Sequence, residues 1–279
     1  MALVDALRAE KQDALQTVLG PGSEKLLSSG DKYSDAAERQ KFLAAYNEQH
    51  KLVPTQPDHM ILQIGKDDWP FPIPLVQQDG KWRFDTAAGR AEILYRRIGR
   101  NELNAIQACL AFVDAQQDYA EKERAGGGNA AYAQRIVSRP GKKDGLYWPA
   151  KAGEEQSPLG ELAARASAEG YRGGAQRTPY HGYYYKVLTR QGPNAAGGEL
   201  DYIVRGNMIG GFALVAYPAE YGNSGVMTFV VNHQGTVFEK DLGVDTARIA
   251  GGMTAFDPDA SWRKVDTGAP SGAPSGGQR

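Results

Sequence analysis

The sequence contains little that would support disulfide, metal or membrane chemistry. Cys109 is the one cysteine among 279 residues, so no disulfide forms within the chain, and the redox compartment stays open. None of the four histidines stands at metal-ligand spacing from another histidine or from the cysteine. We therefore expect no metal and no cofactor. No segment approaches the roughly 20 apolar residues of a membrane span, so we expect no such span.

An excess of charge of one sign is also lacking. Lysine and arginine number 32 and aspartate and glutamate number 33, which gives a net charge of −1. Proteins that bind nucleic acid need a basic face, so the composition argues against a nucleic-acid partner. The nearest basic cluster is Arg96, Arg97 and Arg100, which we interpret as a solvated face of a helix.

Familiar catalytic motifs are missing too. Ser224 follows Gly222-Asn223, but the Gly-x-Ser-x-Gly frame of a nucleophile elbow is not formed. The glycine-rich segments 20–23 and 126–129 lack the lysine and the spacing of a phosphate-binding loop. Catalytic residues stay unassigned, and the sequence favours a protein that is not an enzyme without deciding the question.

Apolar periodicity organises the first part of the chain. It predicts a helix over 3–19 and a second helix over 34–53, with Ser34 as its N-cap. Strands are predicted over 60–64 and 69–76. A hairpin turn at Asp79-Gly80 follows, and it is expected to place Trp82 and Phe84 in the core. The segment 87–124 is mostly helical in pattern, with an interruption at Gly99 that we take as a domain boundary. We expect a helix, and not a free linker, to join the two halves there.

The second part has loops, one short helix over 159–168 and five predicted strands, at 182–189, 201–204, 208–217, 226–232 and 236–241. Helices packed on antiparallel sheets in both halves predict an α+β fold. We divide the chain into a first domain over 1–99 and a second domain over 100–262. The remaining segment, 263–279, is rich in glycine, serine and proline and is predicted to be a disordered tail.

Two aromatic segments are candidates for a ligand- or partner-binding site. In the first, Asp68 precedes a stiff proline-rich run that carries Trp69 and Phe71. This run would either grip a partner or lie as a lid over the first sheet. In the second, Tyr180, His181 and Tyr184 stand where a strand enters a sheet. Here the alternatives are a site in which His181 acts as a base or switch, and a core filled by tyrosines.

Several runs resemble a bacterial family catalogued as domain of unknown function 2950. They are Asp68-Trp69-Pro70-Phe71-Pro72-Ile73-Pro74, Gly80-Lys81-Trp82-Arg83-Phe84-Asp85-Thr86-Ala87-Ala88-Gly89, Ile98-Gly99-Arg100-Asn101-Glu102-Leu103, Pro179-Tyr180-His181-Gly182-Tyr183-Tyr184 and Met208-Ile209-Gly210-Gly211-Phe212. The resemblance extends from about Leu3 to Trp262 and brings no catalytic residues with it. Members usually begin with a secretory leader, which implies a periplasmic or secreted protein. No leader stands in this numbering, so a cytoplasmic protein is the alternative.

Two further resemblances concern topology. Residues 1–97 are similar to the cystatin-like cone of the nuclear transport factor 2 superfamily, in their order of helices and strands up to Asp79-Gly80-Lys81-Trp82-Arg83-Phe84. Residues 101–243 resemble the head of a type IV pilin or pseudopilin, through Ala115-Gln116-Gln117-Asp118-Tyr119-Ala120, Ala216-Tyr217-Pro218, Ser224-Gly225-Val226-Met227-Thr228-Phe229 and Gln234-Gly235-Thr236-Val237. The apolar first half of a pilin helix is replaced by a charged segment, so we expect a monomer or a small closed oligomer.

Two functional hypotheses follow. The first is a non-enzymatic, extracytoplasmic binding or assembly factor whose partner would be another envelope protein. The second is an enzyme that acts on a small molecule in a cleft of the first domain or between the domains, with His181 or Asp68 involved. A deep polar pocket would favour the enzyme, and a shallow aromatic patch would favour the binding module.

Overall fold

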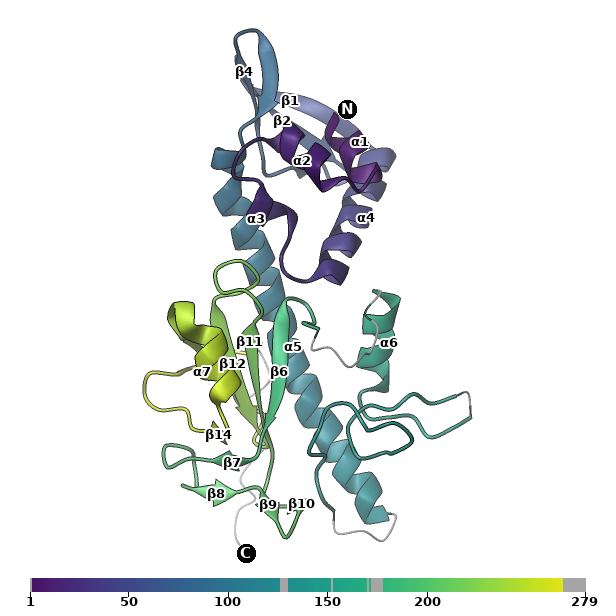
Figure 1. Cartoon of the computed structure of the whole chain (residues 1–279), viewed down its shortest axis with the longest axis vertical. Helices are drawn as coiled ribbons and strands as arrows, with labels where there is room; N and C mark the ends of the chain where they lie inside the picture. The colour runs from purple at the N-terminus through teal and green to yellow at the C-terminus, as the bar shows by residue number, and fades with distance from the viewer. Residues whose placement is uncertain (1, 126–129, 152, 170, 172–177, 268–279) are drawn as a thin grey trace, which may run out of the picture.

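A computed structural model describes residues 2–125, 130–151, 153–169, 171 and 178–267. Its main elements are two five-stranded antiparallel sheets and a long helix, α5 (Thr86–Ala125), that runs past both of them (Figure 1). Helices pack against each sheet, which confirms the α+β class. Within the described residues, no helix combines the length and the apolar character that crossing a membrane requires.

Four helices precede the first sheet: α1 (Ala2–Arg8), α2 (Gln12–Leu19), α3 (Glu24–Leu27) and α4 (Lys32–Glu48). The helix predicted over 3–19 is thus broken, and Glu10 in the break has φ 52°. The predicted N-cap Ser34 is also wrong. Asp31 caps α4, because its carboxylate accepts hydrogen bonds from the backbone N–H groups of Tyr33 and Ser34.

The first sheet contains β1 (His50–Gln56), β2 (His59–Ile64), β3 (Trp69–Pro70), β4 (Leu75–Gln78) and β5 (Lys81–Phe84), in the order β1-β2-β4-β5 with β3 also paired to β2. Val53, predicted as helical, lies in the edge strand β1 opposite Ile61. Pairing with β2 decides its conformation, and Pro54 would have broken the helix in any case. The predicted turn is confirmed: Asp79 and Gly80 both have positive φ, and Gln78 pairs with Lys81.

The prediction that Trp82 lies in the core is wrong. Its side chain is 39% exposed, whereas Phe84 on the same strand is half-buried and contacts the first core. The reason is position, because the β4–β5 hairpin projects beyond the helices at the top of Figure 1. Alternation along a strand assigns a face, but only packing against another layer buries that face.

Helix α5 passes through Gly99 without a break, so the predicted helical connection is confirmed, although Gly99 itself does not interrupt the helix. Its first half contributes Ile93 to a core formed with α1 and α2. Its second half contributes Ala105, Cys109 and Phe112 to the core of the second sheet. Cys109 is fully buried there, and burial raises the pKa of its thiol to about 12. The division into domains at Gly99 stays a prediction.

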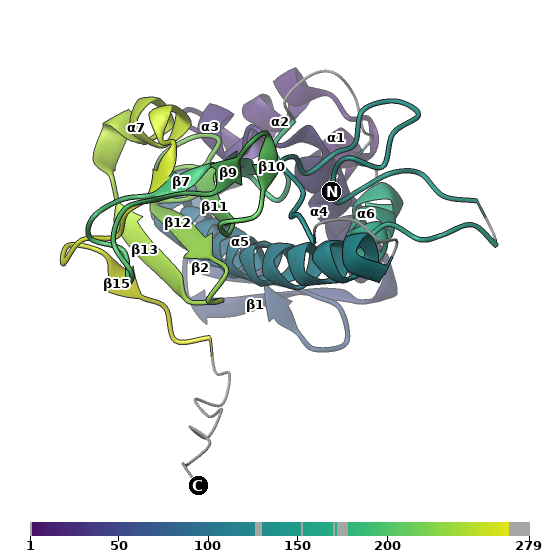
Figure 2. The ribbon, with the colours of Figure 1, turned by 90° about the horizontal axis from the view of Figure 1, so that it is seen from below.

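The second sheet has the order β15-β13-β12-β11-β6, built from β6 (Tyr183–Leu188), β11 (Ala213–Pro218), β12 (Met227–Asn232), β13 (Val237–Asp241) and β15 (Arg263–Lys264). Helix α5 packs on one face and α7 (Thr246–Gly252) on the other (Figures 1 and 2). The strand predicted over 208–217 is divided at Gly210-Gly211. The predicted tail begins too early, since Arg263 pairs with Glu239 in β13. Residues 268–279 of that tail lie outside the described residues.

The remaining elements are small: α6 (Gly160–Ala168), β7 (Arg190–Gln191), β8 (Leu200–Asp201), β9 (Ile203–Val204), β10 (Asn207–Met208), the 3-10 turn η1 (Gly243–Asp245) and β14 (Ala255–Phe256). The helix predicted over 159–168 is confirmed as α6. Strands β14, β7 and β8 form a three-stranded sheet, and β9 and β10 form a hairpin. Helix α7 and strand β14 were not predicted from the sequence.

The two glycines Gly89 and Gly99 of α5 allow a matched test of this packing. A Cβ at Gly99 would meet no atom within 4 Å, so Gly99→Ala should stabilise the protein by about 1 kcal/mol through helix propensity. A Cβ at Gly89 would lie 2.7 Å from the Ile73 Cα, so Gly89→Ala should destabilise the protein instead. Urea denaturation measures both changes. Equal effects of the two substitutions would contradict the packing of α5 on Ile73.

Candidate binding site

Helices α1 to α4 and the first half of α5 surround a cavity of about 390 Å³. Its apolar lining consists of Leu3, Leu7, Leu15, Leu19, Leu26, Leu27, Phe42, Phe71, Pro72, Ile73 and Ile93. Its remaining lining consists of Glu10, Gln12, Ser29, Ser34, Asp35, Glu38, Arg39, Trp69, Arg96, Arg97 and Arg100. This volume lies within the range of small-molecule sites, which are mostly apolar with a few placed polar groups.

Helical spacing places these side chains on the cavity. Leu15 and Leu19 are four residues apart on α2 and therefore share a face. On α5, Ile93, Arg96, Arg97 and Arg100 follow the i, i+3, i+4, i+7 pattern of a single face. The three arginines interpreted as a solvated helix face thus line the cavity, although Arg100 also stays exposed.

The four lining arginines differ in their partners. Three of them form ion pairs with carboxylates: Arg39 with Glu10 at 3.4 Å, Arg96 with Glu92 at 2.6 Å and Arg100 with Glu38 at 2.7 Å. Arg97 donates instead to uncharged oxygens.

The Arg97 acceptors are the Leu26 carbonyl oxygen at 2.5 Å, the Asn223 Oδ1 at 2.6 Å and the Lys25 carbonyl oxygen at 3.3 Å. Burial lowers the pKa of the partly buried Arg97, while Asp35 and Glu220 oppose that shift. The guanidinium therefore joins α3, the cavity and the β11–β12 loop.

The proline-rich segment is divided between the cavity and the sheet edge. Trp69 is 42% exposed, and the Arg96 guanidinium carbon lies 5.1 Å from the centre of its ring. Phe71 packs edge-to-face against Phe42 at 5.4 Å between ring centres. Both Trp69 and Phe71 line the cavity, whereas Asp68 does not. The Asp68 carboxylate accepts hydrogen bonds from Lys51 at 2.7 Å and Gln49 at 3.3 Å.

The second predicted segment lies at the junction between the first helices and the second sheet. The His181 Nε2 lies 3.3 Å from a Glu169 carboxylate oxygen, and the His181 ring lies 4.2 Å from the ring of Tyr180. Burial lowers the pKa of His181, against the attraction of Glu169 and Asp31. Burial also raises the pKa of Tyr180 to about 12. Tyr184 lies apart from this group and packs against Tyr217.

Asp31 connects this junction and was missed by the sequence analysis. Its carboxylate is almost fully buried, and besides capping α4 it accepts hydrogen bonds from the Tyr171 hydroxyl at 2.6 Å and the Gly182 N–H at 3.0 Å. Gly182 has φ 75°, and a Cβ there would lie 2.6 Å from the Asn101 amide nitrogen. The run Ser29-Gly30-Asp31 before α4 offered an N-cap signal. The sequence contained no signal for the other partners of Asp31, because Tyr171 and Gly182 lie 140 and 151 residues further along the chain.

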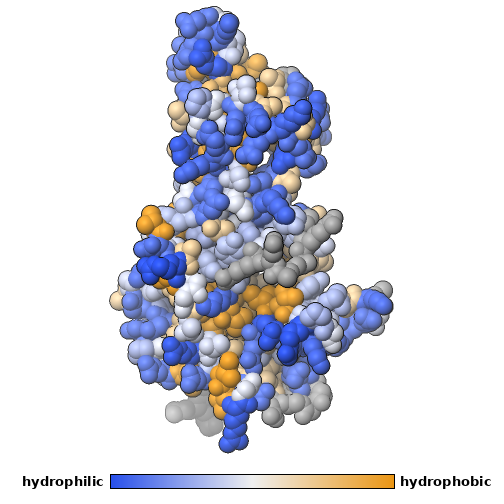
Figure 3. Space-filling view, viewed as in Figure 1, coloured by the Kyte–Doolittle hydropathy of each residue, from blue (hydrophilic) through white to orange (hydrophobic). Residues whose placement is uncertain are grey.

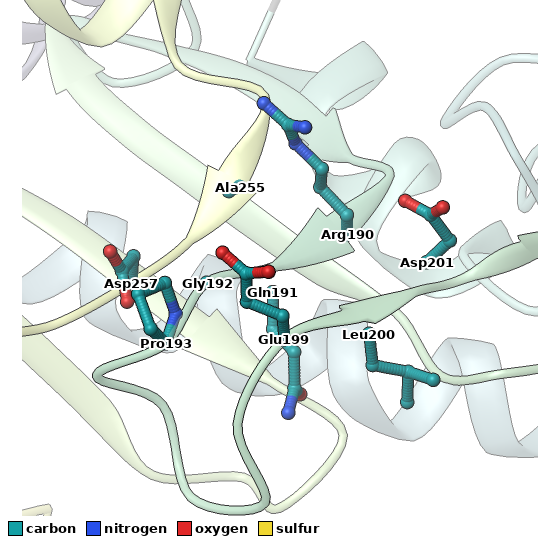
Figure 4. Close-up of a pocket in the computed structure, with 9 residues that line it drawn as sticks. All are labelled: Arg190, Gln191, Gly192, Pro193, Glu199, Leu200, Asp201, Ala255 and Asp257. Carbon is teal, nitrogen blue, oxygen red and sulfur yellow. The ribbon is translucent and has the colours of Figure 1, made fainter.

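A second hollow of about 510 Å³ lies on the small sheet of β7, β8 and β14 (Figure 4). Glu199, Asp201 and Asp257 are spread around it with Arg190. Asp257 accepts hydrogen bonds from the backbone and side-chain nitrogens of Asn194 at 2.7 and 3.0 Å. No group of three or more histidine, cysteine or acidic side chains that could hold a metal ion occurs in the parts of the chain that the structure covers.

The comparison with known families matches residues 1–265 to the family described as "Protein of unknown function (DUF2950)". The chain belongs to this family. The DUF2950 match covers both five-stranded sheets and confirms the first resemblance. No curated protein and no solved structure matches the chain. The resemblances to a cystatin-like cone and to a pilin head stay predictions.

The role of Asp31 at the junction can be tested with a neutral substitution. In Asp31→Asn an NH₂ group, which cannot accept hydrogen bonds, replaces one carboxylate oxygen. Two hydrogen bonds are lost in either orientation of the amide: the two across the junction, or the two that cap α4. We expect a loss of about 2–3 kcal/mol in the free energy of unfolding, measured with urea. The control Asp13→Asn removes an exposed first-turn carboxylate of α2 and should cost below about 1 kcal/mol. Similar losses in both variants would contradict the role of Asp31.

Proposed function

We propose that the protein is a non-enzymatic binding protein that holds a small, largely apolar molecule in the cavity between α1, α2, α3, α4 and α5. The observation that carries this proposal is the cavity lining itself. Eleven apolar residues surround about 390 Å³, with charged groups alongside. A pocket of this volume, lined by apolar side chains with a few polar groups, is typical of small-molecule sites and therefore favours an occupant.

The helices around the cavity suit a binding role. Helices α1 and α2 contain only 7 and 8 residues, and helices this short depend on packing for their stability. Leu7 of α1 is only half-buried, although it lines the cavity. A ligand that covers this side chain would stabilise both helices and shift the folding equilibrium towards the native state.

The place of action and the partner form the second part of the proposal. The family resemblance supports a periplasmic or secreted protein, with an envelope protein as its partner. On the face in Figure 3, hydrophobic surface gathers in the lower half of the molecule, and such patches mark interaction sites. The pilin-like second part would provide this recognition surface, with the protein as a monomer or a small closed oligomer.

The alternative hypothesis, an enzyme, draws on the short distance between His181 and Glu169. A carboxylate beside a histidine is an arrangement used in acid–base catalysis. However, Asp68 and His181 contact different residues, and neither lines the cavity. A molecule bound in the cavity would therefore touch neither of the two residues suggested for catalysis, and the binding hypothesis is preferred.

A cavity-filling substitution tests the proposal. The neutral, apolar dye N-phenyl-1-naphthylamine should bind saturably to the wild type, with a rise in fluorescence. Leu7→Trp should weaken that binding at least tenfold, because the larger side chain occupies the cavity. The control Leu52→Trp changes a 50% exposed residue of β1 outside the cavity and should bind as the wild type does.

Thermal melting of both variants shows whether each is folded. Equal dye affinity in a folded Leu7→Trp variant would place the dye outside the cavity. Failure of the wild type to bind any apolar probe would contradict the proposed function.

A further inference from the structure

We propose that the ligand of this cavity is an anionic amphiphile, an aliphatic chain that ends in a single carboxylate, and that Arg97 binds the carboxylate. This inference rests on the proposed function and specifies the chemistry of its ligand. Three features of the lining support it. Within the described part of the chain, Arg97 lacks the carboxylate partner that the other lining arginines have, leucine side chains form much of the wall, and Asp35 lies in the same cavity as Arg97.

Arg97 has hydrogen-bonding capacity left for a ligand. A guanidinium carries five N–H donors, and three hydrogen bonds use part of this set. Among the described residues, no carboxylate forms an ion pair with Arg97, whereas Arg39, Arg96 and Arg100 each have one. A carboxylate matches the planar fork of a guanidinium better than any neutral group does. An anion entering the cavity would therefore find its available cationic partner at Arg97.

The surroundings of Arg97 strengthen such a contact. Its side chain is partly buried, and its Nη2 donates to the carbonyl oxygen of Leu26, whose side chain also lines the cavity. A charge in a poorly hydrated site interacts more strongly with a counter-charge than an exposed one does. Neutral oxygens satisfy hydrogen bonds of Arg97 but leave its charge without a direct partner, and a bound carboxylate would supply one.

The apolar part of the wall suits an aliphatic chain. Six leucines from α1, α2 and α3 line the cavity, and their side chains offer no hydrogen bonds. A ligand with polar groups along its length would lose its hydration there without replacement, at a cost in affinity. A chain with one polar end avoids that cost, because only the end beside Arg97 carries charge.

Asp35 limits the charge of the headgroup. It lines the same cavity, and both of its carboxylate oxygens lie within hydrogen-bond distance of the Ser29 N–H, at 3.0 and 3.3 Å. Its negative charge lies close enough to Arg97 to act on the pKa of that arginine. Asp35 repels any anionic headgroup, and it repels a dianion more strongly than a monoanion. The site should therefore prefer a carboxylate to a phosphate monoester dianion.

Isothermal titration calorimetry with decanoate, 1-decanol and decyl phosphate tests the proposal at pH 8. The wild type should bind decanoate at least tenfold more tightly than decanol, and decyl phosphate less tightly than decanoate. In Arg97→Gln the preference for decanoate over decanol should fall from at least tenfold to about onefold. The control Arg90→Gln removes an exposed arginine of α5 that does not line the cavity, and it should keep the preference.

Arg97→Lys provides a second variant, because it keeps the charge and loses the fork. Arg97→Lys should retain part of the preference for decanoate over decanol. This measurement tests the role of Arg97 if Arg97→Gln does not fold. Equal binding of decanoate and decanol by the wild type would overturn the carboxylate assignment and leave the cavity proposal standing. An unchanged preference in folded Arg97→Gln would overturn the role of Arg97. Absence of binding by both decanoate and decanol, together with failure of the neutral dye, would overturn the proposed function itself.

Discussion

The continuity of α5 is the constraint on which the rest of the structure depends. Forty residues in one helix extend over about 60 Å at 1.5 Å per residue, long enough to reach both cores. Its first half lines the cavity and its second half packs under the second sheet. A rigid element shared in this way fixes the first helices relative to the second sheet, and a loop between the two halves would not do so.

Polar side chains hold the middle of α5 on both sides. Arg97 donates to two carbonyl oxygens of α3 and to the Asn223 side chain, and Asn101 donates to the Ser224 carbonyl oxygen at 2.9 Å. At the next residue, a Glu102 oxygen accepts hydrogen bonds from two backbone N–H groups at the start of β12. Buried polar contacts of this kind are costly when one partner is missing, so they specify a single arrangement. The proposed ligand site lies at this junction, since Arg97 belongs to both.

The features predicted correctly from the sequence are those that depend on local periodicity and on turn chemistry. The helix α6, the Asp79-Gly80 hairpin and the α+β class follow from spacing and from residues that tolerate positive φ. The errors occurred where contacts with residues distant in the sequence determine the conformation or the burial of a residue. Val53 belongs to a strand because β2 pairs with it, Trp82 is exposed because the hairpin projects beyond the helices, and the cap of α4 is Asp31. The lining of the cavity could not be foreseen, because it comes from five helices and the segment 69–73, whose arrangement no local pattern contains. Trp69 and Phe71 line it, whereas Asp68, Tyr180, His181 and Tyr184 do not.

Hydrogen–deuterium exchange along α5 tests the central claim, that one uninterrupted helix joins the two cores. The account predicts that the amides of residues 95–103 exchange as slowly as those of residues 105–113, which lie under the second sheet. Exchange of residues 95–103 that is faster by orders of magnitude would contradict it, because the middle of α5 would then open as a hinge.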